Sequence, residues 1–274
     1  MWHARVTTVG ASAVVGEEVP GDLPWARVAV AGALAGVTSG LFGVGGGIVI
    51  VPALVMLAAF PHKLATGTSL SAIAPISAAG VVGYATGGEV DWVAALCVAL
   101  GSVLGAVVGT RLLVRLPTRA LQLVFAASMV VTAVRMLFTD ADASGRSDLT
   151  VGMALAMVLL GLVAGVFAGL LGVGGGIIIV PALTLLFGVP HVLAKGTSLA
   201  VIAPTAVVGT VRNRKAGLTA LRPAAVVGAA GVASAFAASR VSLGLDERVS
   251  QGLFAGLLVF AAIRLIRESR ESRR

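Results

Sequence analysis

Two glycine clusters in this sequence have the residue types and spacing to bind an anion through backbone amides. GVGGG occurs at residues 43–47 and again, 129 positions later, at 172–176, each time inside an apolar stretch. Glycine has no Cβ, so its N–H can approach an oxygen atom closely, and a helix beginning after the turn adds further donors and a positive dipole end. Packing between membrane helices is the alternative role of such glycines. The candidate anion-binding glycines are Gly43, Gly45, Gly46, Gly47, Gly172, Gly174, Gly175 and Gly176.

Hydroxyl groups recur at a fixed distance after each glycine cluster. GTSL occupies residues 67–70 and 196–199, so it belongs to the same duplicated pattern. We expect it to open the third apolar segment of each copy, where its hydroxyls serve as helix N-caps, as substrate contacts, or as both. The candidate residues are Thr68, Ser69, Thr197 and Ser198.

Three basic or titratable side chains lie close to these hydroxyls. His62 and His191 each follow a proline at the end of an apolar segment, and Lys195 directly precedes the second GTSL. The histidines are expected at the membrane interface or in proton coupling, and Lys195 could add positive charge for an anion. No Asp or Glu lies inside an apolar segment, and the single cysteine leaves no cysteine metal site, so we expect no metal, no cofactor and no catalytic residue.

The composition is that of a membrane protein. The 274 residues are 58% hydrophobic and only 12% charged, against about 25% charged in ordinary soluble domains. Long apolar runs without ten-residue alternation indicate transmembrane helices, so the expected fold class is an all-α polytopic bundle. The net charge is +8, and the basic residues lie between and after the apolar segments. Basic residues at these positions are expected to set the membrane topology, so we expect no nucleic-acid partner.

The chain is an internal duplication. Residues 35–54 and 164–183 are identical at 16 of 20 positions without a gap. Each copy divides into about five apolar segments. The expected segments are 28–42, 48–60, 66–87, 92–114 and 119–138 in the first copy and 152–171, 177–189, 195–212, 219–241 and 248–266 in the second.

The first two segments of each copy are expected to form a hairpin with a glycine tip. Residues 28–61 carry no charge, yet one helix of that length would far exceed the hydrocarbon thickness of about 30 Å. Five segments per copy place eight of thirteen basic loop residues, together with the basic C-terminal tail, on one face. That face is expected to be cytoplasmic, with both termini inside. An odd number of segments would insert the halves upside down relative to each other, as in many transporters.

The paired motif resembles the sulfite exporter TauE/SafE family. The resemblance is carried by GxGGGxxxxP at residues 43–52 and 172–181, each followed by TSL, and it extends over about residues 28–267. It implies a bacterial inner-membrane protein that moves small sulfur-containing anions such as sulfite or organosulfonates.

Together these observations predict a multi-pass secondary transporter of small anions that alternates access around the two glycine breaks. A cation or metal permease and a non-transporting scaffold are the alternatives, and a homodimer is left open. The expected divisions are a mobile tail 1–26, repeat half 27–138, linker 139–150, repeat half 151–267 and basic tail 268–274.

Overall fold

A computed structural model describes residues 23–112, 126–127, 129–135 and 150–271. These residues form helices joined by short turns, without a strand among them, which confirms the all-α prediction. Residues 139–149 of the predicted linker, residues 1–22 of the predicted N-terminal tail and residues 272–274 of the predicted basic tail lie outside the described residues. The helices with assigned bounds are α1 (Trp25–Phe42), α2 (Gly47–Ala58), α3 (His62–Ala85), α4 (Trp92–Leu112), α6 (Val151–Leu171), α7 (Gly176–Phe187), α8 (His191–Lys215), α9 (Leu221–Leu243) and α10 (Glu247–Glu271). Residues 126–127 and 129–135, in the predicted fifth segment, are also helical.

Seven of the helices described are long and apolar enough to cross a membrane, which makes the chain a polytopic membrane protein. The outer faces of α4 and α6 support this, because exposed leucines recur at helical spacing along both, at Leu96, Leu100 and Leu104 and at Leu155 and Leu159. Helices α2 and α7 have 12 residues each, or about 18 Å, so neither reaches across the hydrocarbon alone.

The chain breaks where the glycines predict. Helix α1 ends with Gly43 in the left-handed region (φ 70°), and α2 begins behind Gly46 (φ 81°). Helix α6 ends at Gly172 (φ 67°), and α7 follows Gly175 (φ 80°). A β-carbon would strain these conformations, so glycine is what lets each apolar stretch fold into a hairpin.

Helices α3 and α8 begin four residues earlier than the sequence analysis expected. Pro61 and Pro190 stand at their N-caps, so the helices start at His62 and His191. The prediction that GTSL opens these helices is therefore wrong, because Thr68 and Ser69 lie in the second turn. Their hydroxyls are available for contacts other than N-capping.

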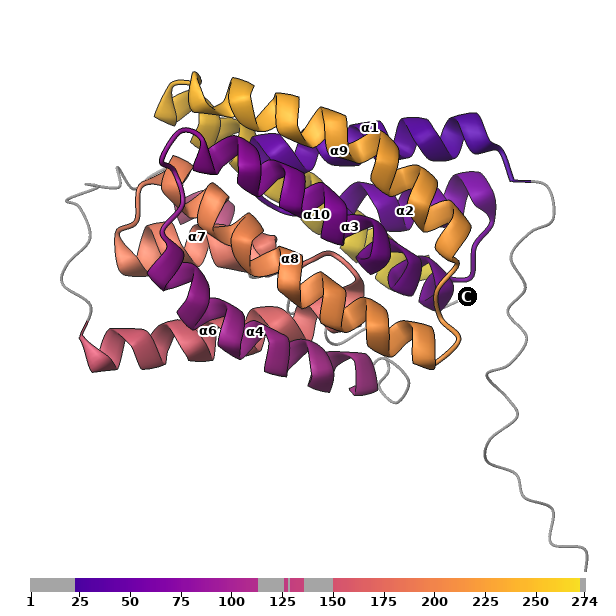
Figure 1. Ribbon diagram of the computed structural model, residues 1–274, viewed down its shortest axis with the longest axis horizontal. Coiled ribbons are helices and arrows are strands. Elements are labelled where there is room, and N and C mark those ends of the chain that lie inside the picture. The colour runs from indigo at the N-terminus through magenta and orange to yellow at the C-terminus, as the bar shows by residue number, and fades with distance from the viewer. Residues whose placement is uncertain (1–22, 113–125, 128, 136–149, 272–274) are drawn as a thin grey trace, which may run out of the picture.

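The first helix of each half packs on the fourth helix of the other half. Helix α1 lies along α9, α6 lies along α4, and α3 and α8 contact each other in the middle (Figure 1). The α6–α4 contact is a seam of small residues, in which a β-carbon on Gly161 would come within 2.0 Å of the Val98 carbonyl oxygen. A β-carbon on Gly32 would meet the Val227 carbonyl oxygen at 2.4 Å in the α1–α9 seam. These glycines have the packing role of small residues in membrane helices.

The contacts between the halves are reciprocal. Gly32 and Val227 touch in one seam. Their equivalents in the repeat, 129 residues away, are Gly161 and Val98, and these two residues touch in the other seam. Figure 1 shows α1 beginning on the right and α6 beginning on the left, so these equivalent helices run in opposite directions along the long axis. The two halves therefore exchange equivalent surfaces with each other.

Substitution in the α4–α6 seam tests this packing. A β-carbon on Gly165 would lie 2.0 Å from the Ser102 carbonyl oxygen, whereas one on Gly152 of the same helix meets nothing within 4 Å. We expect Gly165→Leu to lower the free energy of unfolding by about 1–3 kcal/mol or more, through overpacking. Gly152→Leu should cost less than about 0.5 kcal/mol. Thermal unfolding and size-exclusion profiles in detergent measure the stability of both variants. Equal stability of Gly165→Leu and Gly152→Leu would contradict the close packing of α4 on α6.

Candidate functional site

The two glycine tips meet in the interior of the protein. A β-carbon on Gly47 would lie 2.5 Å from the Gly172 carbonyl oxygen, and one on Gly176 would lie 2.5 Å from the Gly43 carbonyl oxygen. All eight candidate glycines are buried. Sequences 129 residues apart thus form one buried junction of unwound backbone, which the structure brings together as a candidate site.

The two GTSL serines hold this junction from opposite halves. Ser69 Oγ donates to the Gly172 carbonyl oxygen at 2.9 Å, and Ser198 Oγ donates to the Gly43 carbonyl oxygen at 2.8 Å. These carbonyls belong to residues that end α1 and α6, where helical acceptors lose their partners. Each hairpin tip is therefore satisfied by the third helix of the other half.

The two GTSL threonines bind backbone amides at the starts of α4 and α9. Thr197 Oγ1 accepts from the Asp91 N–H at 2.9 Å, and Thr68 Oγ1 accepts from the Ala220 N–H at 3.0 Å. All four hydroxyls are fully buried and serve backbone groups. They position the junction in the described structure, and direct contact with a substrate stays a prediction for them.

Lys195 lies beside the first tip and serves the end of α1. Its side chain is fully buried, and its ammonium donates to the Leu41 carbonyl oxygen at 3.1 Å, to Ser242 Oγ at 2.8 Å and to Ser250 Oγ. A cation is favourable at a helix C-terminus because the last carbonyls carry partial negative charge. Its counterpart in the first half is Thr66, which donates to its own helix at the His62 carbonyl, so this contact is particular to the second half.

The two predicted histidines occupy different surroundings. His191 is fully buried, its ring edge-to-face with Phe254 at 5.4 Å and its backbone N–H donating to Glu247 Oε1 at 3.3 Å. His62 is exposed and lines a pocket beside the glycine junction. Of the three residues predicted for charge or coupling, His62 alone lines this pocket.

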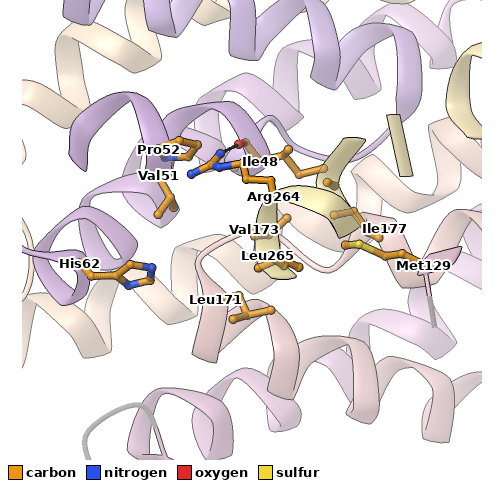
Figure 2. Close-up of a pocket in the computed structure, with 12 residues that line it drawn as sticks. Ile48, Val51, Pro52, His62, Met129, Leu171, Val173, Ile177, Arg264 and Leu265 are labelled. Carbon is orange, nitrogen blue, oxygen red and sulfur yellow. Dashed lines mark hydrogen bonds between the residues drawn. The ribbon is translucent and has the colours of Figure 1, made fainter. Parts of the chain in front are cut away.

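That pocket lies between the two tips and the C-terminal half of α10. It has a volume of about 40 Å³, room for about three water molecules, and its wall is mostly apolar. Gly47, Ile48, Val51 and Pro52 come from the first hairpin, whereas Leu171, Val173 and Ile177 come from the second (Figure 2). Arg264 enters from α10 and gives the wall a full positive charge.

Proline explains why an arginine lies here. Pro52 has no N–H, so the carbonyl of Ile48, four residues earlier, loses its helical donor. Arg264 Nη1 donates to that oxygen at 2.9 Å, as the dashed line in Figure 2 shows. A guanidinium has five donors in a planar fork and suits oxyanions, and the N-terminus of α2 beside it adds a positive dipole end. The pocket therefore favours a small anion.

The sequence analysis did not single out Arg264 as a site residue. A signal was present, because Arg264 repeats Arg135 at the spacing of 129, and because each proline of the motif lies four residues after an isoleucine. Among the described residues, no group of three His, Cys, Asp or Glu side chains could hold a metal ion.

Comparison with known proteins identifies the family of this chain. The profile of the sulfite exporter TauE/SafE family matches residues 5–136 and 157–274. The chain belongs to this family. A probable membrane transporter protein of Xylella fastidiosa (strain 9a5c) is 31% identical over 183 residues, covering 65% of this chain and 70% of that protein. The probable membrane transporter protein YunE of Bacillus subtilis (strain 168) is 28% identical over 216 residues, covering 69% and 77%.

The probable membrane transporter protein MJ0441 of Methanocaldococcus jannaschii is 27% identical to this chain over 190 residues, covering 66% of this chain and 69% of that protein. No solved structure gives a significant match. A TauE/SafE family member with these spans is a multi-pass membrane transporter.

The cross-half serine bonds can be tested in pairs. Ser69→Ala and Ser198→Ala should each lower the free energy of unfolding by about 1–3 kcal/mol, because each leaves a buried carbonyl without its donor. Ser71→Ala is the matched control, since Ser71 Oγ donates at 3.3 Å within its own helix and is only partly buried. Denaturation in detergent measures the free energy of unfolding of all three variants. If Ser69→Ala and Ser198→Ala were as stable as Ser71→Ala, the junction would be contradicted.

Proposed function

We propose that this transporter moves small anions, above all sulfite or another sulfur oxyanion, through the pocket between the glycine junction and Arg264. The observation that carries the proposal is the guanidinium of Arg264 in an otherwise mostly apolar wall, next to the first turn of α2. An anion there gains a charge-assisted hydrogen bond and the field of the helix terminus without bulk water competing.

The size and charge of the pocket support a small inorganic substrate. A volume of about 40 Å³ accommodates an ion of a few heavy atoms rather than a long organic chain. His62, an exposed side chain that also lines the pocket, has a ring N–H that can donate a hydrogen bond to an oxyanion. The family description, a sulfite exporter, agrees with this chemistry.

We further propose that the halves lie upside down relative to each other in a bacterial inner membrane, with both termini in the cytoplasm. The opposite directions of α1 and α6 support this orientation, and so do the start of α1 and the end of α10 at the same end of the molecule (Figure 1). Arg212, Arg214 and Lys215 lie in the last turn of α8, at that same end. Clustered basic residues at membrane boundaries favour the cytoplasmic side.

Neutralising Arg264 tests the substrate site. Arg264→Gln in proteoliposomes loaded with sulfite should lower the efflux rate about tenfold to a hundredfold, the equivalent of about 1.5–3 kcal/mol for a hydrogen bond to a charged group. Arg264→Lys should retain more flux than Arg264→Gln, because it keeps the charge and loses the planar fork. Arg267→Gln, an exposed arginine three residues further along α10, is the control and should behave as the unaltered protein.

A thermal-shift measurement completes this test. Sulfite should raise the unfolding temperature of the unaltered protein and of Arg267→Gln but not that of Arg264→Gln, because ligand binding stabilises the folded state. If Arg264→Gln and Arg267→Gln had equal sulfite flux, the proposed substrate site would be wrong. A shift with cations alone would indicate a cation permease, and absence of flux for any solute would indicate a scaffold.

A further inference from the structure

The repeat generates a second pocket that the proposed site does not use. This pocket, of about 220 Å³, is lined by α7 and by the helical residues 129–135. Its wall includes Ile177, Pro181 and Arg135. These three residues are the repeat equivalents of Ile48, Pro52 and Arg264, which line the first pocket.

The same backbone chemistry applies in this second pocket. Pro181 lies inside α7 and has no N–H, so the carbonyl of Ile177 loses its helical donor, as the carbonyl of Ile48 does in α2. Arg135 is exposed and contributes a guanidinium to the pocket wall, next to the first turn of α7. The pocket thus combines a cation with the positive end of a short helix, the two features that favour an anion in the first pocket.

The two pockets are neighbours with a common wall. Met129 and Ile177 line both of them. Both side chains are almost fully buried, with exposed fractions of 2% for Met129 and 3% for Ile177. Methionine is unbranched and has three rotatable side-chain bonds, so it can change rotamer at low cost in a packed region. The two arginine-lined pockets therefore share two apolar side chains in their walls.

We propose that the second pocket is a further oxyanion site, that Met129 and Ile177 form the gate between the two sites, and that anions pass from one arginine to the other. This inference rests on the anion transport proposed above. If the halves lie upside down as proposed above, we expect the two pockets to open toward opposite membrane faces. An anion that leaves Arg264 through the gate meets Arg135 before it reaches water, so it is not left without a positive partner in an apolar environment.

Neutralising Arg135 tests the second site separately from the first. Arg135→Gln should lower sulfite flux roughly tenfold but leave the thermal shift produced by sulfite at the Arg264 site intact, whereas Arg264→Gln should lose both. Arg135→Lys should retain most of the flux, which separates loss of charge from loss of folding. The control is Arg240→Gln, because Arg240 is exposed and donates to Thr86 Oγ1 at 2.6 Å, away from both pockets.

Cysteine accessibility tests the gate. In a Cys97→Ser background, Met129→Cys should react with a negatively charged thiosulfonate reagent. Sulfate should slow this reaction several-fold, and it is used in place of sulfite because sulfite itself attacks thiosulfonates and disulfides. Val130→Cys is the matched control, since Val130 is 41% exposed and lines neither pocket. A lipid-facing thiol should be protected from a charged reagent, because burial in apolar surroundings disfavours the reactive thiolate.

The outcomes distinguish this inference from the proposed function. If Arg264→Gln loses flux while Arg135→Gln has the same flux as Arg240→Gln, the second site is wrong and the first site stands. If Met129→Cys reacts no faster than Val130→Cys, the gate is wrong and the first site stands. If Arg264→Gln keeps full flux, the proposed function fails.

Discussion

A broken helix inside a membrane must find partners for its backbone, and this constraint organises the whole structure. Water is absent from the hydrocarbon, so an unpaired N–H or C=O costs several kcal/mol there. The residues that end α1 and α6 expose such carbonyls at Gly43 and Gly172, and the donors are Ser198 and Ser69. Because each donor belongs to the other half, neither hairpin is satisfied without its counterpart.

The same requirement explains the position of the positive charge. Proline inside α2 removes one backbone bond, and Arg264 replaces it at the Ile48 carbonyl. Placing an arginine there serves two purposes, since the guanidinium satisfies the freed carbonyl and brings a cation to the wall of the pocket. A structural demand of the broken helix thus creates the electrostatic feature on which the proposed anion binding depends. The duplication places a proline and an arginine, Pro181 and Arg135, in the wall of the second pocket as well.

Local features of this chain could be predicted from its sequence, whereas contacts between the halves could not. The glycine break is a property of consecutive residues, so GVGGG predicted the hairpins, in which Gly43 and Gly46 adopt left-handed conformations. The role of Ser69 depends on which carbonyl lies opposite it, and that carbonyl is 103 residues away. The predicted start of α3 was wrong, because the third apolar segment was taken to begin at residue 66. In the structure Pro61 is the N-cap, and the helix begins at His62.

Arg264 and Lys195 illustrate the same limit. In the sequence, Arg264 lies near the end of the predicted segment 248–266 and was not predicted as a site residue. Helix α10 continues to Glu271, and Arg264 lies on a pocket wall. Lys195 was expected near an anion, and the structure shows it fully buried against the end of α1. Charge alone does not distinguish a topology signal, a helix cap and a ligand contact, because the difference lies in the elements packed around the side chain.

The most direct measurement is a structure determined with selenite, an electron-rich analogue of sulfite. The account predicts one selenium position within hydrogen-bond reach of Arg264 and the first turn of α2, beside two glycine tips that remain in contact. Selenium bound elsewhere in the protein, or glycine tips separated and exposed to bulk water, would contradict it.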